Sequence, residues 1–265
     1  MSAVLFRFLA LFFGVYLLVL ALLYFFQERL LFVPSKLDGG YKFEFDAKFE
    51  EINLNVEGAI LNGLHFYASK PKGAVLFFHG NAGSLKGWGK FGEFYTKLGY
   101  DFYVFDYRGY GKSSGEIRSE RELMSDSEAM MRRALEDFSA KDITLMGYSL
   151  GSGLATRIAG KFEVPRLILV APYFKFDELA SSKVFFVPKF IVKYKIPTVS
   201  FIKEAKDTDI SIIHGKFDDL IDISNSYKLV KHLKQDDKFY EIEAGHNDIL
   251  TGREFERILE EILSR

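Results

Sequence analysis

The strongest constraint on the fold is a repeated alternation of short apolar runs with segments of helical character. The apolar runs fall at residues 74–78, 102–105, 143–146, 167–170, 210–213 and 239–242. Most are separated by segments that favour helix, such as residues 120–138 and 151–161. Such alternation indicates βαβ units, in which connecting helices bury both faces of parallel strands. The sequence therefore predicts an α/β fold with a mainly parallel central sheet and helices on both faces.

Two segments depart from this alternation of predicted strands and helices. Residues 49–67 alternate apolar and polar side chains about Glu57 and Gly58, which predicts an antiparallel hairpin before the parallel strands. The segment 172–207 is too long for a simple connection between strands. It contains the aromatic and lysine-rich sequence VFFVPKFIVKYKIP. An insertion of this length indicates a lid or binding element.

The amino terminus contains a long apolar segment. Residues 8–26 carry no charge over 19 positions, so a helix there would span the roughly 30 Å hydrocarbon core of a bilayer. A cleaved signal peptide would need a small-x-small site, and residues 25–28 (FFQE) offer none. We predict a single-pass transmembrane anchor at residues 1–26, a connector at 27–48 and a catalytic domain at 49–265. Lys and Arg are too evenly distributed around the anchor to fix its orientation.

Composition excludes several classes of function. The chain has 35 basic and 36 acidic side chains, so it lacks the basic excess of a nucleic-acid-binding protein. It has no cysteine, which excludes disulfides, cysteine nucleophiles and Cys-ligated zinc. No pattern resembles a metal-ligand cluster, and no cofactor is implied.

The pentapeptide GYSLG at residues 147–151 matches the G-x-S-x-G nucleophile elbow. The apolar run at 143–146 precedes it and a helical segment follows, which is the strand–turn–helix context the motif requires. This context favours Ser149 as a nucleophile over a structural Gly-Ser turn.

A second motif, HGNAG at residues 79–83, closes the first parallel strand. Acyl transfer requires fixed donors for the oxyanion of the tetrahedral intermediate. In a strand–elbow–helix arrangement one donor is the N–H after the nucleophile, here Leu150. The N–H of Asn81 is the expected second donor, with that of Ala82 as the alternative.

A serine nucleophile needs a general base, and five histidines are available. They are His65 in the early hairpin, His79 in the turn motif, His214 at the end of a strand, His232 in a charged helix and His246 in a late loop. The chain order nucleophile, acid, histidine favours His246. His214 is interpreted as stabilising a turn.

The acid that orients the imidazole should follow the strand at residues 210–213. The text HGKFDD supplies Asp218 and Asp219 there, and neighbouring loop residues point in different directions. Asp218 is the expected partner of His246, with Asp219 in reserve, while Asp222 is expected to cap the next helix.

The glycine-rich text DYRGYGKS at residues 106–113 lacks the G-x-x-x-x-G-K-S spacing of a phosphate loop. A structural role is favoured, with Arg108 and Asp106 tying loops together near the active site.

Together the motifs HGNAG, DYRGYGKSSG, GYSLG, HGKFDD and AGHND, in this order, resemble those of the α/β-hydrolase superfamily. The chain is similar to its membrane-anchored branch, whose members have a short hydrophobic anchor and often a Q-x-x-L-x-F-x-P-like connector, as at residues 27–34. The resemblance implies a triad of Ser149, Asp218 and His246, with the N–H groups of Asn81 and Leu150 as the oxyanion hole. The insertion at 172–207 matches the family in its position but not in its amino-acid sequence, so the resemblance implies no particular substrate.

The leading hypothesis is a membrane-anchored serine hydrolase that cleaves an ester or thioester through an acyl-enzyme. An anchor and an aromatic insertion fit an acylated or lipidic substrate, such as a lysophospholipid, a thioester or a lipidated protein. The alternatives are a serine peptidase of the same fold and a non-catalytic membrane-tethered scaffold. The scaffold hypothesis predicts erosion of the triad, yet each required residue type is present in order.

Overall fold

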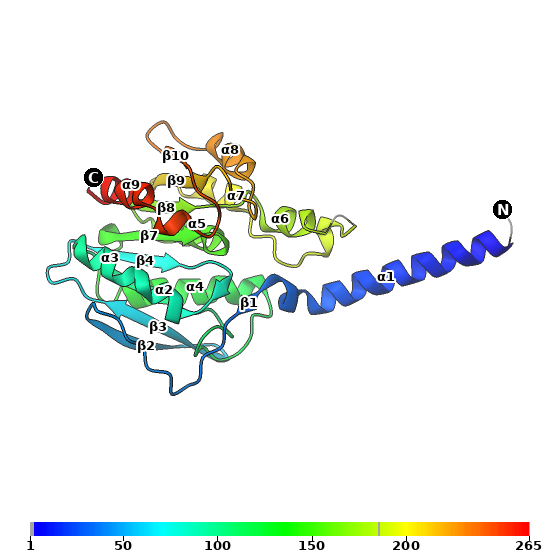
Figure 1. Cartoon of the computed structure of the whole chain (residues 1–265), viewed down its shortest axis with the longest axis horizontal. Coiled ribbons are helices and arrows are strands. Elements are labelled where there is room, and N and C mark those ends of the chain that lie inside the picture. Colours follow the sequence, from blue (N-terminus) through cyan, green and yellow to red (C-terminus); the bar gives the residue numbers. More distant parts are fainter. Residues whose placement is uncertain (1–2, 185, 265) are drawn as a thin grey trace.

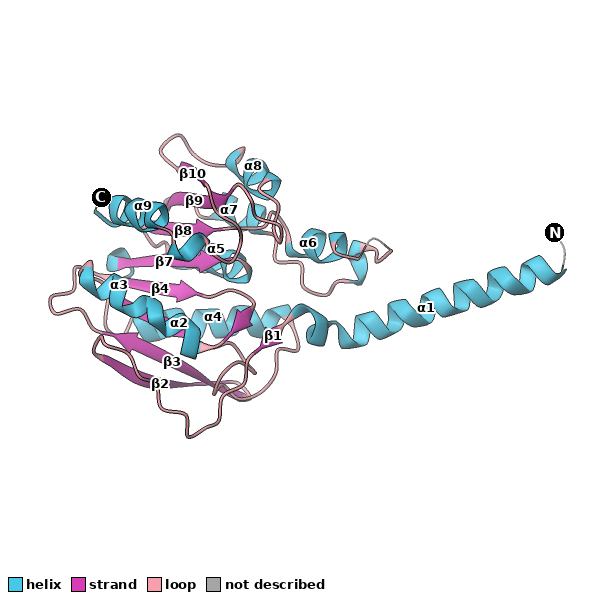
Figure 2. Cartoon of the chain, viewed as in Figure 1, coloured by secondary structure: helices cyan, strands magenta, loops and turns pink. Residues whose placement is uncertain are grey.

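The computed structural model describes residues 3–184 and 186–264. Its centre is an eight-stranded sheet with the order β10-β9-β8-β7-β4-β6-β3-β2 (Figure 2). The strands are β2 (Phe49–Val56), β3 (Ala59–Phe66), β4 (Ala74–Phe78), β6 (Asp101–Phe105), β7 (Ile143–Tyr148), β8 (Arg166–Val170), β9 (Asp209–Gly215) and β10 (Lys238–Ile242). The helices of this domain are α2 (Leu85–Trp88), α3 (Gly92–Lys97), α4 (Glu120–Ala134), α5 (Leu150–Phe162), α6 (Phe176–Ser182), α7 (Thr198–Glu204), α8 (Ser224–Val230) and α9 (Arg253–Ser264).

Strand pairing follows the sequence pattern. The strands from β10 through β9, β8, β7 and β4 to β6 pair in parallel. The hairpin of β2 and β3 adds antiparallel pairs at one edge. The predicted α/β fold with a mainly parallel sheet is confirmed. Parallel strands end at one edge of the sheet, so the loops after β4, β7, β9 and β10 gather there.

Helices cover both faces of this sheet, and each face has its own apolar core. On one face the sheet packs against α4, α5 and α7; on the other it packs against α3 and α9. Helix α9 packs on the sheet because its apolar residues share one face. Phe255, Ile258, Leu259 and Ile262 recur at helical spacing and are all buried. The strands between these layers are apolar at consecutive positions because both of their faces are covered.

The long segment between β8 and β9 contains two different parts. Helix α7 lies in the apolar core against α5, with Val199 and Ile202 buried. The preceding residues form α6 and the short 3₁₀ helix η3 (Lys189–Ile191), and η3 contacts both α6 and the amino-terminal helix. Residues of α6 and η3 line a cavity at Ser149, whereas those of α7 do not. We call residues 176–184 and 186–194 the lid segment.

Helix α1 (Ala3–Leu31) projects away from the α/β domain (Figure 1). At 29 residues it is long and apolar enough to cross a membrane, and most of its side chains are exposed. The helix does not end at residue 26 but continues through residues 27–31, which the sequence assigned to the connector. Its last turns meet polar partners on the domain, and strand β1 (Val33–Pro34) then pairs with β5 (Ala82–Gly83).

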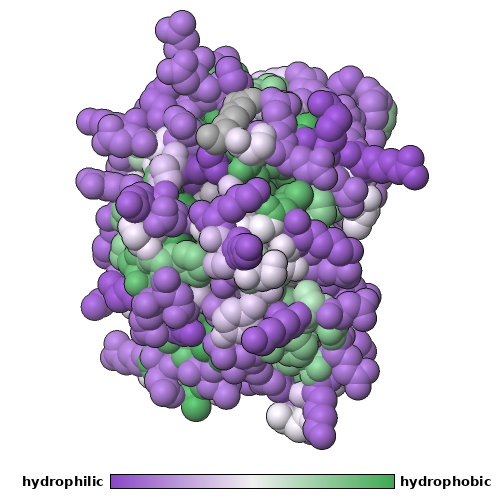
Figure 3. Space-filling model, turned by 90° about the vertical axis from the view of Figure 1, so that its left-hand side faces the viewer, coloured by the Kyte–Doolittle hydropathy of each residue, from purple (hydrophilic) through white to green (hydrophobic). Residues whose placement is uncertain are grey.

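The face of the molecule that points away from α1 has the opposite character. Hydrophilic side chains dominate it, and apolar groups form only small patches (Figure 3). Most of the exposed large apolar side chains lie on α1, at the other side of the molecule.

Candidate active site

Ser149 lies at the sharp turn between β7 and α5. Its backbone has φ 52° and ψ −117°, a conformation that non-glycine residues rarely adopt. The turn is possible because Gly147 and Gly151 are close to neighbouring backbone: a Cβ at Gly151 would collide with the carbonyl of Phe78. The Ser149 N–H donates to the carbonyl of Val170 at 3.0 Å, which fixes the turn against β8.

His246 follows β10 and faces this serine. Its Nε2 lies 3.1 Å from Ser149 Oγ, and its Nδ1 lies 2.7 Å from Asp218 Oδ2. The Tyr148 hydroxyl donates to the His246 carbonyl at 2.7 Å and holds the loop. Ser149, His246 and Asp218 are all buried. The structure therefore joins the three residues singled out in the sequence by two hydrogen bonds.

Asp218 rather than Asp219 reaches the histidine. The other oxygen of Asp218 accepts the N–H groups of Leu220 at 3.0 Å and Ile221 at 2.7 Å, whereas Asp219 is exposed. Burial opposes ionisation of Asp218. Its hydrogen bonds with histidine side chains and with Ile221 outweigh that cost and hold its pKa well below the usual range. A carboxylate that stays ionised can stabilise a positive charge on His246.

His214 holds the loop after β9, in line with the turn-stabilising role expected for it, but its contact with Asp218 was not predicted. Its Nε2 donates to the Ile221 carbonyl at 2.8 Å and lies 3.2 Å from Asp218 Oδ2, while its Nδ1 lies 2.6 Å from the Ser226 hydroxyl. It is fully buried and therefore packs Asp218 in place. The spacing of histidine and aspartate in HGKFDD was the available signal.

The two predicted oxyanion donors border the same space. Leu150 opens α5, so its N–H has no acceptor within the helix. Among the described residues no acceptor is found for the N–H of Leu150 or of Asn81. Asn81 lines the cavity with Ser149, whereas the alternative donor Ala82 does not line it and belongs to the β1–β5 pair.

The Asn81 side chain is itself fixed by other groups. Its Nδ2 donates to the Leu31 carbonyl at the end of α1, at 2.5 Å. The Tyr110 hydroxyl lies 2.7 Å from the Asn81 carbonyl and 3.0 Å from its Oδ1. The loop that carries one candidate donor is thus tied directly to the amino-terminal helix.

The loop after β6 has the structural role expected for it. Asp106 accepts the Leu85 N–H at 3.1 Å, and Arg108 makes a two-point ion pair with Asp126 at 2.6 and 2.8 Å. Burial raises the pKa of Asp106 to about 8 and lowers that of the neighbouring His79 to about 4. His79 Nδ1 lies 2.7 Å from the carbonyl of Gly80, so this histidine orders its own loop.

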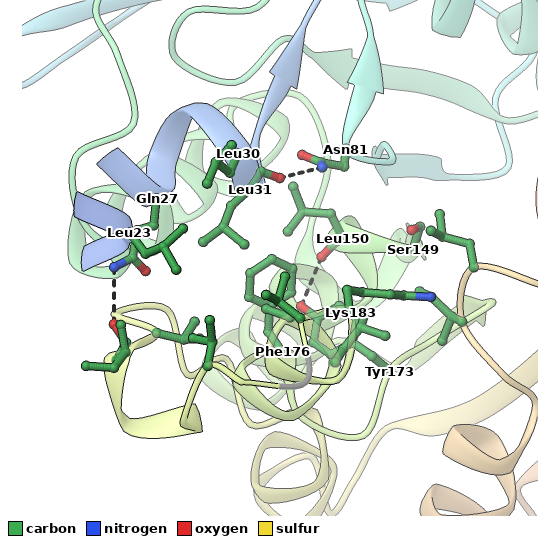
Figure 4. Close-up of a pocket in the computed structure, with 18 residues that line it drawn as sticks. Leu23, Gln27, Leu30, Leu31, Asn81, Ser149, Leu150, Tyr173, Phe176 and Lys183 are labelled. Atoms are coloured by element: carbon green, nitrogen blue, oxygen red, sulfur yellow. Dashed lines mark hydrogen bonds between the residues drawn. The ribbon is translucent and has the colours of Figure 1, made fainter. Parts of the chain in front are cut away.

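An apolar cavity of about 300 Å³ opens above Ser149. Leu30 and Leu31 of α1 lie on one side, with Ser149 and Leu150 across from them (Figure 4). The lid segment supplies much of the remaining wall, and Tyr173, Leu220 and Ile221 complete it. Within residues 3–184 and 186–264, no group of three or more acidic or histidine side chains could hold a metal.

Comparisons with known proteins agree with this architecture. Residues 73–198 match the family model described as the alpha/beta hydrolase fold. Human Alpha/beta hydrolase domain-containing protein 17B is 30% identical over 198 residues, which cover 71% of this chain and 65% of the human protein. This chain belongs to the α/β-hydrolase superfamily. The match spans slightly less than two thirds of that relative's length.

Other similar proteins fit the same superfamily. Alpha/beta hydrolase domain-containing protein 17C of Xenopus laevis is 29% identical over 233 residues, covering 83% of this chain and 71% of the relative. An esterase from Pyrococcus furiosus superposes with a TM-score of 0.69 at 18% identity, covering 89% of this chain and 97% of the esterase. A soluble variant of the Saccharomyces cerevisiae monoglyceride lipase superposes with a TM-score of 0.63 at 18% identity, covering 84% and 96%. At these identities the structural matches establish the α/β-hydrolase fold.

Proposed function

We propose that this α/β hydrolase is a serine hydrolase that cleaves an ester or thioester through an acyl-enzyme. The observation that carries the proposal is the continuous hydrogen-bonded series from Ser149 through His246 to Asp218 beneath an apolar cavity. A nucleophile, a base and an orienting acid in this order are the arrangement that activates a serine hydroxyl.

In the first half-reaction Ser149 Oγ attacks the acyl carbonyl carbon while its proton passes to His246 Nε2. The N–H groups of Leu150 and Asn81 stabilise the resulting oxyanion. Collapse of the intermediate breaks the bond to the alcohol or thiol, which takes the proton from His246. The ionised Asp218 stabilises the imidazolium between these transfers.

In the second half-reaction water attacks the acyl-enzyme. His246 takes a proton from that water and returns it to Ser149 Oγ as the carboxylic acid departs. The products are therefore one acid and one alcohol or thiol. This chemistry uses only groups of the chain and water.

We further propose that α1 anchors the protein in a membrane as a single span. Its length, apolar composition and exposed side chains support an anchor over a core helix. An acylated or lipidic small molecule, or a lipidated protein, is the substrate class that fits such a location together with an apolar cavity at the serine.

The test is ester hydrolysis by the full chain in detergent micelles. We expect turnover of p-nitrophenyl acyl esters, and Ser149→Ala should lower kcat by about 10⁴-fold or more. Ser139→Ala, at an exposed serine without a side-chain capping bond, is the matched control and should retain the wild-type rate. Absence of turnover by the wild-type protein at every acyl length would favour the scaffold alternative.

A further inference from the structure

The last turns of α1 are built into the domain rather than linked to it flexibly. Gln27 is buried, and its Nε2 donates to the carbonyls of Tyr24 at 3.0 Å and Ile191 at 3.2 Å. Its Oε1 accepts the Lys193 N–H at 2.8 Å. Glu28 adds an ion pair with the Lys193 ammonium at 3.0 Å. The helix and the lid segment are therefore held in one defined arrangement.

These turns form a wall of the cavity at Ser149. Leu23, Gln27, Leu30 and Leu31 line it from α1 (Figure 4). Leu31 lies eight positions after Leu23, so the cavity follows α1 for about 12 Å. Leu23 lies inside the uncharged run at 8–26. The end of the cavity far from Ser149 therefore lies level with the segment proposed to cross the bilayer.

The lid segment reaches further along the same helix. The Tyr16 hydroxyl donates to the Phe186 carbonyl at 3.0 Å. Tyr16 lies near the middle of the uncharged run and is eleven residues before Gln27, or about 16 Å away along the helix. If residues 8–26 span a bilayer, the lid tip at Phe186 must lie beneath its surface.

The composition of the lid segment suits that depth. Val184, Phe186 and Phe190 are exposed, by 37%, 41% and 73%. Exposed apolar groups gathered on one element mark a surface for a membrane or partner. Lys189 has an exposed side chain whose long stem can keep its ammonium group at the headgroups while nearby residues lie deeper.

We propose that the cavity is an acyl-chain site shared by α1 and the lid segment and open to the hydrocarbon of the bilayer. The ester or thioester carbonyl lies at Ser149, and the acyl chain runs between Leu30 and Leu31 on one side and Val187 and Ile191 on the other. The acyl chain of the substrate enters the cavity laterally from the bilayer without passing through water. The anchor is thus a part of the substrate site as well as a tether. This inference rests on the proposed hydrolase function for its chemistry.

The first test measures acyl-chain binding in the full-length protein in phosphatidylcholine nanodiscs. Two fluorophosphonates, one with a short alkyl chain and one with a long one, react as Ser149 Oγ displaces fluoride from phosphorus. Leu23→Trp and Val187→Trp add bulk to the cavity from α1 and from the lid segment, respectively. Each should lower the ratio of long-chain to short-chain labelling rates by about tenfold or more, because several methylene groups lose their apolar contacts.

Leu22→Trp is the matched control, because Leu22 is the neighbour of Leu23 on α1 and is exposed outside the cavity. It should keep the wild-type ratio. A wild-type ratio in both cavity variants would overturn the proposal, and so would an equal loss in the control. Failure of wild-type protein to react with either probe would instead reject the proposed hydrolase function.

The second test measures the depth of the lid tip and does not depend on catalysis. The chain has no cysteine, so Phe186→Cys and Ile60→Cys each provide one labelling site for a fluorophore. Ile60 is exposed on the hairpin of β2 and β3. In nanodiscs containing lipids with nitroxide on the acyl chain, the probe at position 186 should be quenched and that at position 60 should not. Equal fluorescence at both positions would overturn the membrane-inserted lid tip.

Discussion

The candidate catalytic centre and the junction of α1 with the lid segment border one cavity, but the sequence encodes them differently. The centre comes from short motifs at strand ends, such as GYSLG around Ser149. The junction depends on single polar groups far apart in the chain, with Gln27 bonded to Ile191 and Tyr16 to Phe186. A short motif can be recognised from neighbouring residues in the sequence. A contact between residues far apart in the chain can be recognised only in the folded structure. The two regions can therefore be perturbed separately.

The largest expected effect comes from breaking the centre while leaving the junction intact. Asp218→Asn removes the ionised partner of His246 and should lower kcat/KM for a short acyl ester by about 10⁴-fold. Asp219→Asn alters an exposed neighbour and should have little effect. Steady-state kinetics of both variants checks the assignment, and comparable losses in the two would contradict it.

A smaller effect is expected where the two regions touch. Asn81→Ala keeps the backbone N–H but removes the hydrogen bonds of the side chain to Leu31 and Tyr110. If these bonds aim the N–H at the oxyanion, kcat should fall by about tenfold or more while KM for a short ester stays unchanged. A fall in thermal stability with unchanged kcat would show that the side chain only supports the fold.

Breaking the junction alone should loosen the lid segment. Gln27→Ala leaves the Lys193 N–H and the Ile191 carbonyl without their side-chain partner, at a cost of about 1–3 kcal/mol. Amide hydrogen exchange at residues 191–194 should then be about 10-fold to 100-fold faster. Gln235→Ala, at an exposed glutamine, is the matched control. Unchanged exchange in Gln27→Ala would mean that other contacts hold the lid.

The smallest effect concerns the buried pair of His79 and Asp106, whose side chains lie 3.6 Å apart. Burial raises the pKa of Asp106 to about 8 and lowers that of His79 to about 4. From about pH 4 to 6.5 the folded state holds one proton on Asp106 and the unfolded state holds one on His79. The two states therefore bind equal numbers of protons at this pair, and the pair gives stability no pH dependence in this range. Between about pH 6.5 and 8 only Asp106 contributes, and stability should fall as pH rises, by at most about 1.4 kcal/mol per pH unit.

Denaturant unfolding across this range tests the pair. In Asp106→Asn the decline between about pH 6.5 and 8 should disappear, because the variant has no proton to lose at this position. A decline that persists would place its origin in another group.

Much of the fold could be predicted from the sequence because its signals are local. Apolar runs bounded by helices gave the parallel strands, and alternation gave the β2–β3 hairpin. The structure also joins Ser149, His246 and Asp218 by hydrogen bonds, and their catalytic roles remain predictions. Each follows the end of a strand, so the parallel sheet brings them to one edge.

The features that were missed depend on tertiary partners. Helix α1 continues to Leu31 because Gln27 and Glu28 find hydrogen-bonding partners on the lid segment, which composition alone cannot show. Helix α7 packs on α5 in the core although the sequence grouped it with the insertion. His214 contacts Asp218 only once the loop after β9 has folded back.

The most direct measurement of the central claim is mass-spectrometric mapping of the residue that a fluorophosphonate modifies in the full-length protein. The account predicts one adduct on Ser149, formed at a rate that falls by several orders of magnitude in His246→Ala, where the base is missing. An adduct on another residue, or labelling of Ser149 that is unchanged without His246, would contradict it.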